Sequence, residues 1–305
     1  MRILLSGTTG QIGGALQPLL DGRGYLLTPR RSEFDLARPE TLNGALDAFE
    51  PDLILNPAAY TAVDRAEDEP ELAFRINAEA PSVIARWAAQ HQVPLVHFST
   101  DYVFDGSGTT PWREDDPCAP LSIYGKSKLA GEASIRDAGG VHLIVRIAWV
   151  YAAEGTNFFR TIIRLARERS KLRVVSDQIG SPTSARSVAS AVINLLFEDR
   201  GDLSARFAKA QGLVHLTNSE FTSWHGFATR IIEGLRERDL DLRADEVEPI
   251  GTKDFPTKAA RPANSRLDLS RLRDVFGVDM PSWQNALETE LDAFSEAERR
   301  ATPGA

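Results

Sequence analysis

Short runs of apolar residues alternate with longer amphipathic stretches over the first two hundred residues of the chain. The apolar runs are rich in Val, Ile and Leu and lie at Ile3–Ser6, Tyr25–Thr28, Leu53–Asn56, Leu95–Ser99, Leu143–Ile147 and Arg173–Val175. The stretches between them have helical spacing, over Gln11–Leu20, Glu40–Phe49, Glu71–Gln90, Tyr124–Arg136 and Asn157–Glu168. Such alternation is typical of a parallel sheet covered by helices on both faces, so it predicts a doubly wound, Rossmann-type α/β fold.

The pattern loosens after about residue 200, where proline becomes more frequent and the expected elements shorten. A last helix is expected near Ser282–Arg299. We therefore predict two domains, a Rossmann-type domain over residues 1–200 and a smaller α+β domain over residues 201–305. Loops 149–157 and 176–184 are expected to contribute to the smaller domain.

Composition narrows the class of protein. The 305 residues are 42% hydrophobic and 26% charged, which is typical of a soluble globular protein. The net charge of −8 argues against a nucleic-acid partner. Cys118 is the only cysteine, so neither an intrachain disulfide nor a cysteine-based metal site can form. The apolar run within Met1–Gly7 is too short for a signal peptide, and no later run could span a membrane, so we expect a cytoplasmic protein.

A glycine-rich turn follows the first expected strand and opens the first helix. It reads Gly7-Thr8-Thr9-Gly10-Gln11-Ile12-Gly13, with the spacing G-x-x-G-x-x-G. Glycines permit a tight turn and let the backbone approach a pyrophosphate, while the helix N-terminus offers N–H groups and the positive end of a dipole. A ligand-free strand–helix turn is the alternative. In this context we favour a dinucleotide cofactor.

The end of the second strand bears on which dinucleotide is bound. An acidic residue there would accept hydrogen bonds from the ribose 2′-hydroxyl of NAD, but this chain has Arg30-Arg31 and no carboxylate until Glu33. Paired arginines suit a 2′-phosphate, although they could also form a solvated basic turn. We expect NADPH, with NADH as the alternative. Asp35 and Leu36 would lie near the adenine.

Tyr124 and Lys128 form a Tyr-x-x-x-Lys pair on one face of an expected helix. A free tyrosine has a pKa near ~10, too high for efficient acid–base catalysis at neutral pH, and a nearby ammonium lowers it. The alternative is a surface tyrosine packed over a lysine side chain. Ser99 and Thr100 end the fourth strand, where a hydroxyl can donate to a substrate carbonyl or simply cap a turn. Three such signals in order at three strand ends favour an oxidoreductase.

Several segments together resemble one family. They are GTTGQIG, DLILNPAAYTAVDRAE, STDYVFDG, YGKSKLAGE, RIAWVYAAEGTNF, DQIGSPT and RPANSRLD, in order from residue 1 to about residue 295. The chain resembles the dTDP-4-dehydrorhamnose reductase family within the extended short-chain dehydrogenases/reductases. STDYVF and Tyr-x-x-x-Lys are shared by many sugar-nucleotide enzymes, whereas AYTAVDRAE, AWVYAAEGTNF and RPANSRLD narrow the match.

The resemblance implies that Tyr124 protonates the alkoxide formed when the C4 ketone receives hydride. Lys128 would tune Tyr124 and hold the nicotinamide ribose, and Thr100 would polarise the ketone. Within the glycine turn, Gly10, Gln11 and Ile12 match cofactor contacts, and so do Asp35, Leu36, Ala59, Tyr60 and Thr61 further along the chain. The smaller domain would help to bind the substrate, and the expected substrate contacts are Asp101, Trp149, Asn157, Arg261, Asn264 and Arg266. Trp149 could equally be a core aromatic.

The chain also departs from the family. Some relatives dimerise around a divalent ion held by an acidic residue in the first helix, whereas this chain has Gly13-Gly14-Ala15 there. We therefore predict no metal site, and a monomer or a homodimer. The expected partner is a small nucleotide sugar, with no nucleic acid and no membrane. Another sugar-nucleotide reductase or epimerase, or a non-catalytic regulatory subunit that keeps the fold, remain alternatives.

Overall fold

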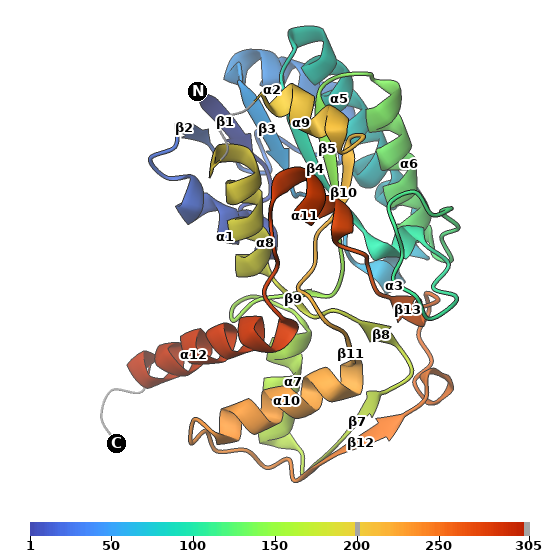
Figure 1. The fold of residues 1–305 in the computed structure, drawn as a ribbon, viewed down its shortest axis with the longest axis vertical. Helices are drawn as coiled ribbons and strands as arrows, with labels where there is room; N and C mark the ends of the chain where they lie inside the picture. The colour runs from blue at the N-terminus through green and yellow to red at the C-terminus, as the bar shows by residue number, and fades with distance from the viewer. Residues whose placement is uncertain (199–201, 302–305) are drawn as a thin grey trace.

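The computed structural model describes residues 1–198 and 202–301. Its centre is a six-stranded sheet in which every pair of neighbouring strands is parallel (Figure 1). The strand order is β10-β5-β4-β3-β1-β2. The strands are β1 (Arg2–Leu5), β2 (Tyr25–Leu27), β3 (Leu53–Asn56), β4 (Leu95–Thr100), β5 (His142–Ile147) and β10 (Leu213–His215). The order reverses between β1 and β3, and ligands of doubly wound sheets bind beyond the carboxyl ends of the strands at such a point. The predicted fold class is confirmed.

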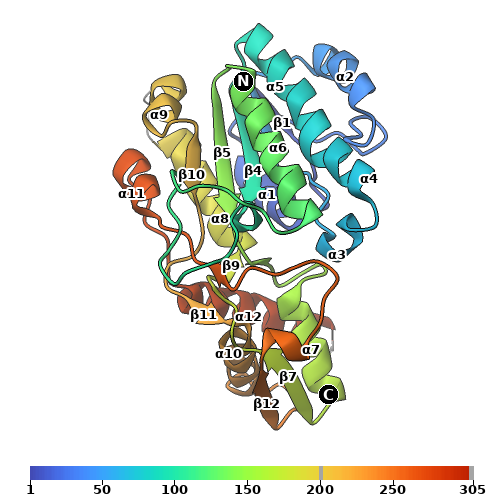
Figure 2. The ribbon, with the colours of Figure 1, turned by 90° about the vertical axis from the view of Figure 1, so that its right-hand side faces the viewer.

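Helices cover both faces of this sheet because the side chains of each strand alternate in direction. Ile3 and Leu5 face one layer, which contains α1 (Gln11–Leu20), α8 (Ala185–Ile193), α9 (Leu203–Lys209) and α11 (Ser270–Phe276). Leu4 faces the other layer, which contains α2 (Leu42–Phe49), α5 (Ala80–His91) and α6 (Ile123–Asp137). In Figure 2, α5 and α6 lie over the near face of the sheet. Both faces are therefore buried, as the continuous apolar strands predict.

A second hydrophobic core lies beyond the carboxyl ends of the strands. Its side chains come mainly from α7 (Phe158–Glu168), β7 (Lys171–Val175), α10 (Trp224–Arg236) and α12 (Trp283–Ala301). β7 pairs in parallel with β12 (Glu246–Ile250). The figures show these elements grouped at one end of the molecule, below the sheet. The carboxyl ends of the main-sheet strands therefore point toward this smaller part.

A domain boundary at residue 200 implies that all strands before it belong to the main sheet and all strands after it to the smaller part. Two strands do not follow this rule. The run predicted as a strand at Arg173–Val175 belongs to β7, which lies in the smaller part, whereas Leu213–His215 lies in the main sheet. Burial explains the difference. Strand β7 alternates buried and exposed residues, as expected for a strand covered on one face, while β10 is buried throughout. The two-domain division stays a prediction, and the chain passes between the two parts more than once.

The helix predicted over Glu71–Gln90 is interrupted. It consists of α4 (Pro70–Phe74), a π-helical segment η2 (Arg75–Glu79) and α5. Here η2 lies very close to α6, because a Cβ on Gly131 would come within 2.1 Å of the Asn77 carbonyl oxygen. Single π-helical turns are frequent at functional sites.

The remaining elements are short. They are η1 (Pro39–Thr41), α3 (Val63–Ala66), η3 (Asp101–Val103), β6 (Val150–Tyr151), β8 (Ile179–Gly180), β9 (Thr183–Ser184), η4 (Asn194–Glu198), β11 (Thr222–Ser223), η5 (Thr252–Asp254) and β13 (Asn264–Ser265). No helix among the described residues is both long and apolar enough to cross a membrane.

Candidate active site

The glycine turn joins β1 to α1 at the point where the strand order reverses. Gly7 has φ +61°, and a Cβ on Gly13 would lie 2.2 Å from the Gly7 carbonyl oxygen, so both positions require glycine. Helix α1 begins after Gly10 without a side-chain cap. Its first-turn N–H groups are therefore available to an anion. These features fit a dinucleotide pyrophosphate.

The basic turn after β2 is exposed. Arg31 forms an ion pair with Asp35 at 3.3 Å between Nε and Oδ1, and the backbone N–H of Arg30 donates to Glu33. Asp35 also accepts from the backbone N–H of Ala37 at 3.0 Å, which fixes the turn. Leu36 is buried in the core beneath it. Two guanidinium groups, only one of them paired with Asp35, leave this turn able to attract a phosphate.

The loop after β3, which contains Ala59, Tyr60 and Thr61, is tied to the helices beside it. Asn77 accepts from the backbone N–H of Tyr60 at 2.8 Å and donates both to the Tyr60 carbonyl and to Ser127, each at 3.0 Å. Asn77 lies in η2 and Ser127 in α6. The Tyr60 hydroxyl donates to Glu69 at 2.5 Å. Buried, fully bonded amides of this kind hold a loop in one conformation, so η2 positions the Ala59–Thr61 loop relative to α6.

Tyr124 and Thr100 come together at the carboxyl end of β4. Tyr124 is buried in the first turn of α6, whose N-cap is Ser122, and its side chain lies beside that of Thr100. Burial raises the pKa of Tyr124 above its ordinary value, and the neighbouring Thr100 hydroxyl opposes that shift. Thr100 also accepts from the Tyr102 N–H at 3.2 Å, so it caps η3 as well as facing Tyr124. The capping interpretation of this hydroxyl is confirmed, and its donation to a substrate carbonyl stays a prediction.

Lys128 lies one turn further along α6 and is fully buried. Its Nζ atom donates to the Phe98 carbonyl at 2.6 Å and lies 3.3 Å from Nε2 of His97. Burial lowers the pKa of Lys128 to about 8, while Glu132 opposes that shift. Within the described residues, the ammonium is thus anchored to β4 and is not hydrogen-bonded to Tyr124.

Asp101 carries a buried carboxyl group next to Thr100. Its Oδ1 accepts from the Thr100 hydroxyl at 3.1 Å, whereas its Oδ2 is buried without a partner. Burial raises the pKa of Asp101 to about 6, against hydrogen bonds from Ser265 and Thr100. An unsatisfied buried oxygen beside two hydroxyl groups fits contact with a polyhydroxy ligand. The sequence-based expectation that Asp101 contacts substrate stays a prediction that this geometry supports.

A segment before β13 crosses over the site. Arg261 donates to Asp64 of α3 at 2.6 Å and hydrogen-bonds with Tyr102. Its Nη1 atom is buried and has no partner. The same Asp64 accepts from the backbone N–H of Ala259 at 3.0 Å. Arg261 thus brings one buried, unpartnered donor to the site, as an anionic substrate group requires.

Trp149 follows β5 in a left-handed backbone conformation, with φ +49°. Its ring stacks on Trp224 of α10 at 3.6 Å and 11° between the ring planes. Non-glycine residues in this region are uncommon and often lie at functional sites. The stack joins the end of the main sheet to the smaller part, so Trp149 packs as an aromatic side chain and also lies at the junction where a substrate would bind.

The other expected substrate contacts hold local structure. Asn157 is the N-cap of α7, accepting from Arg160 N–H at 3.0 Å, and its amide donates to two carbonyl groups. Asn264 is buried and donates to the Ser107 and Thr110 carbonyls at 3.2 and 2.8 Å. Arg266 donates to the Thr109 carbonyl at 2.6 Å. Their contact with a nucleotide stays a prediction.

Comparison with known proteins decides the family. The model of the RmlD substrate-binding domain family matches residues 1–296. A dTDP-4-dehydrorhamnose reductase of Burkholderia thailandensis is 42% identical over 289 residues, which cover 94% of this chain and 97% of the relative. The chain belongs to the RmlD family of dTDP-4-dehydrorhamnose reductases. This membership makes it a nicotinamide-dependent oxidoreductase and confirms the resemblance.

Solved structures of RmlD relatives have the same fold. A dTDP-4-dehydrorhamnose reductase of Clostridium acetobutylicum superposes with a TM-score of 0.87 at 33% identity, over 96% of this chain and 99% of the other. One from Bacillus anthracis, solved in complex with NADP, gives 0.86 at 33% identity with the same coverage. These likenesses support a nicotinamide cofactor. Among the residues described in this RmlD-family structure, no group of three or more His, Cys, Asp or Glu side chains is placed to hold a metal ion.

Sequence reasoning missed several polar residues of this site. Ser6, Asn56 and His97 are buried in strands β1, β3 and β4 or at their ends, and Asn77 interrupts a helix. The first three carry a signal that could have found them, because each is polar within an otherwise apolar run. Buried polar groups are nearly always hydrogen-bonded, so three on neighbouring parallel strands indicate a shared network.

Proposed function

We propose that this chain reduces the C4 ketone of dTDP-4-dehydro-L-rhamnose to give dTDP-L-rhamnose, with a reduced nicotinamide cofactor as the second substrate. The observation that carries the proposal is the pairing of Tyr124 with Thr100 at the end of β4, beside the glycine turn. The high identity to dTDP-4-dehydrorhamnose reductases over nearly the whole chain supports the sugar nucleotide.

The residues divide the chemistry of ketone reduction between them. When bound, the reduced nicotinamide supplies the hydride that C4 accepts. The Thr100 hydroxyl donates to Asp101 at 3.1 Å in this structure. On substrate binding it would turn to the ketone oxygen and, together with the Tyr124 hydroxyl, stabilise the negative charge that develops there. Because burial keeps the pKa of Tyr124 high, its hydroxyl stays protonated at neutral pH and can give a proton to that oxygen.

Lys128 and Asp101 would assist the proton transfer from Tyr124, one by stabilising charge and the other by orienting the sugar. The Lys128 ammonium would stabilise the phenolate left on Tyr124, which lowers the energy of the charged product state. Asp101 would orient the sugar hydroxyl groups through its unpartnered Oδ2. Arg261, with its free Nη1, is the cation best placed for the diphosphate of the nucleotide.

The cofactor would be held by residues of three neighbouring strand ends. The first turn of α1 would bind the pyrophosphate, and Arg30 and Arg31 would favour NADPH over NADH through its 2′-phosphate. Ala59, Tyr60 and Thr61 would line the cofactor on the side fixed by Asn77.

The direct test is the oxidation of NADPH and of NADH, followed by absorbance, with dTDP-4-dehydro-L-rhamnose as substrate. We expect rapid oxidation that depends on the sugar nucleotide and is faster with NADPH at limiting cofactor. Absence of oxidation, with cofactor binding shown by titration, would contradict the proposal and point to another sugar nucleotide or to a regulatory role.

Replacing Tyr124 by Phe tests the proton donor. We expect kcat to fall by at least about 10²–10⁴-fold, the usual size of a general-acid contribution, while the cofactor Kd stays within a factor of two or so. Stopped-flow turnover and fluorescence titration of NADPH provide the two measurements. Tyr25→Phe is the control, because Tyr25 is an exposed tyrosine of β2 that belongs to none of the proposed binding groups. Wild-type turnover in the Tyr124→Phe variant would overturn the mechanism.

A further inference from the structure

Behind the proposed active site, a continuous chain of buried polar side chains runs from the glycine turn to Lys128. The Ser6 hydroxyl donates to Oδ1 of Asn56 at 2.6 Å, and Nδ2 of Asn56 lies 3.1 Å from Nδ1 of His97. Nε2 of His97 then lies 3.3 Å from Nζ of Lys128. All four residues are at most 3% exposed. The contacts cross three adjacent strands, β1, β3 and β4, and end on α6.

The positions of the hydrogen atoms in this series of polar contacts depend on one another. If Nδ2 of Asn56 donates to Nδ1, a neutral His97 must carry its proton on Nε2, which then faces Lys128. Two protonated nitrogens cannot hydrogen-bond to each other, so Lys128 must then be a neutral amine that accepts from Nε2–H. This is the first self-consistent arrangement.

The second arrangement holds when Lys128 is an ammonium. It donates to Nε2, so the His97 proton is on Nδ1 and requires an acceptor. A rotation of the Asn56 amide by about 180° supplies this acceptor. Its Oδ1 then accepts from Nδ1 of His97, and its Nδ2 donates to the Ser6 hydroxyl. The ring carries one proton in both arrangements, and the additional proton of the second is on Lys128.

The surroundings keep the His97 ring neutral. Burial and the neighbouring Lys128 hold the pKa of His97 well below its usual value. The neighbouring ionised groups include Glu132 of α6, which favours the ammonium. Glu132 is itself paired with Arg146 of β5 and with Arg136 of α6, each at 2.7 Å. Strand β3 contributes only the neutral Asn56. The proton count of this buried region therefore changes on Lys128 rather than on the ring.

We propose that His97 is a positioning residue for Lys128, and that its tautomer, through Asn56, couples the protonation of the lysine to Ser6 at the start of the glycine turn. Together with the Phe98 carbonyl, His97 occupies two of the three N–H donors of the ammonium. The third donor is thereby directed and left for the ribose or Tyr124. The Ser6 hydroxyl oxygen also accepts from the backbone N–H of Ala58 at 3.3 Å, in the loop against which Gly7 packs.

The tautomer can be measured without any substrate. Long-range ¹H–¹⁵N NMR of the ring-labelled full chain, from about pH 6 to about pH 10, reports which ring nitrogen is protonated, and His97→Gln assigns the signal. We expect an Nδ1–H ring at low pH that becomes Nε2–H with a midpoint near the Lys128 pKa of about 8. In Lys128→Met the change should disappear. A single tautomer throughout, a charged ring, or an unchanged transition in Lys128→Met would overturn the inference.

Kinetics test the positioning role, which rests on the proposed function of Lys128. His97→Leu removes an acceptor of the ammonium and lowers the pKa of Lys128, so the alkaline fall of kcat should move down by about one pH unit. His97→Gln, whose amide oxygen can accept, should recover much of that shift. His91→Gln is the control, because His91 is exposed at the end of α5. An unchanged pH profile in His97→Leu would contradict the inference.

The two outcomes stay separable. A wild-type chain that oxidises no cofactor would contradict the proposed function, while the NMR transition would still test the His97–Lys128 coupling. An active wild-type chain whose ring shows one tautomer would contradict the coupling alone.

Discussion

Asp101 shows what a single buried carboxyl does to this molecule. Its pKa is raised from 3.8 to about 6, first by burial, and only partly offset by hydrogen bonds. The folded state therefore holds a proton between these pH values that the unfolded chain releases. By linkage, stability falls as pH rises through this window and stays reduced above it.

Asp101→Asn should therefore stabilise the fold at neutral pH while weakening catalysis. The shift corresponds to at most about 3 kcal/mol of unfolding free energy, and the gain should vanish below about pH 4. Urea unfolding at several pH values measures it, with kcat/KM measured in parallel. Asp105→Asn is the control. Hydrogen bonds from Ser107 lower the pKa of the exposed Asp105 carboxyl, so its replacement should not raise the unfolding free energy at neutral pH. Equal stability of Asp101→Asn and wild type at neutral pH would contradict the assignment.

Arg30 and Arg31 carry the prediction of cofactor choice. Replacing both by Ala should raise KM for NADPH by about tenfold or more and leave KM for NADH nearly unchanged, because only NADPH has the 2′-phosphate that they would bind. Arg38→Ala, an exposed arginine paired with Glu40 beyond this turn, is the control. If the double variant keeps the wild-type preference, the argument for NADPH is wrong.

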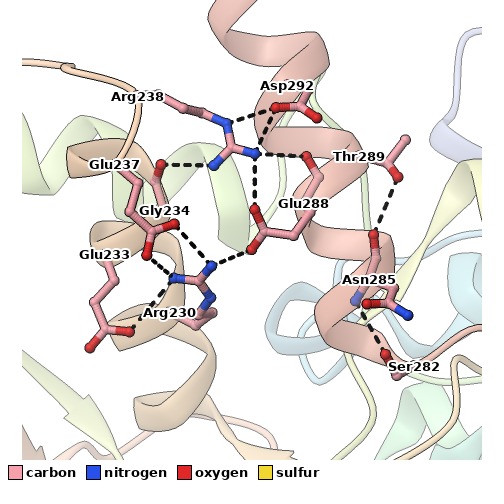
Figure 3. A network of polar contacts seen from close by, with 10 residues as sticks. All are labelled: Arg230, Glu233, Gly234, Glu237, Arg238, Ser282, Asn285, Glu288, Thr289 and Asp292. Carbon is pink, nitrogen blue, oxygen red and sulfur yellow. Dashed lines mark hydrogen bonds and ion pairs between the residues drawn. The ribbon is translucent and has the colours of Figure 1, made fainter.

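At the scale of elements, α10 and α12 are joined by a network of ion pairs that Figure 3 shows. Glu288 of α12 is at its centre, contacting Arg230 at 2.5 Å and Arg238 at 2.9 Å. Arg238 also contacts Asp292 at 2.6 Å. The arginines are mostly buried while the carboxylates are more exposed, so the network supplements the apolar contacts of the second core rather than replacing them.

Glu288→Gln should lower the unfolding free energy by about 0.5–1 kcal/mol, because it removes one charge shared by two arginines at a partly solvated site. The loss should shrink at high salt, since screening weakens the pairs in the wild type. Thermal unfolding at low and high salt measures both effects. Glu233→Gln, whose contact with Arg230 is 3.9 Å long and exposed, should change stability by only a few tenths of a kcal/mol. Equal losses in the two variants would show that the network has no special role.

At the scale of the whole molecule, the segment 258–266 links the smaller part of the chain to the main sheet across the site. Asp64 of α3 holds it through Ala259 N–H and Arg261, and Lys258 is paired with Asp68. A Cβ on Gly106 would come within 2.5 Å of Pro262, so this segment also packs tightly against the loop after η3. The arrangement places one end of the proposed substrate site on a connection between the two parts.

Asp64→Ala should therefore raise KM for the sugar nucleotide by about tenfold, equivalent to about 1.4 kcal/mol, without changing KM for the cofactor. The reason is that Arg261 loses the partner that fixes its direction. Steady-state kinetics with each substrate varied in turn measures the split. Asp68→Ala is the control, because its pair with Lys258 is largely exposed. A parallel rise in both KM values would indicate general loosening instead.

The sequence by itself determined the fold class, the strand–turn–helix unit of the glycine turn and the placement of Tyr124 and Lys128 on one helix. The reason is that these depend on short-range features: apolar strands buried on both faces, glycines at positive φ or close contact, and an i, i+4 pair on a helix. Thr100 could be expected near the ligand crevice because ligands of doubly wound sheets bind beyond the carboxyl ends of the strands.

Only the tertiary structure decided which long-range partners these residues meet. The sequence pattern predicts Arg173–Val175 of β7 among the strands of the main sheet and does not predict Leu213–His215 as a strand, yet pairing places β10 in the main sheet and β7 beside β12. Lys128 turns toward His97 rather than Tyr124, and Asn157 is used as a helix cap, because hydrogen-bond partners depend on packing between distant segments. Spacing along a chain fixes which residues share an element, whereas burial and contact across elements fix what each polar group must bind.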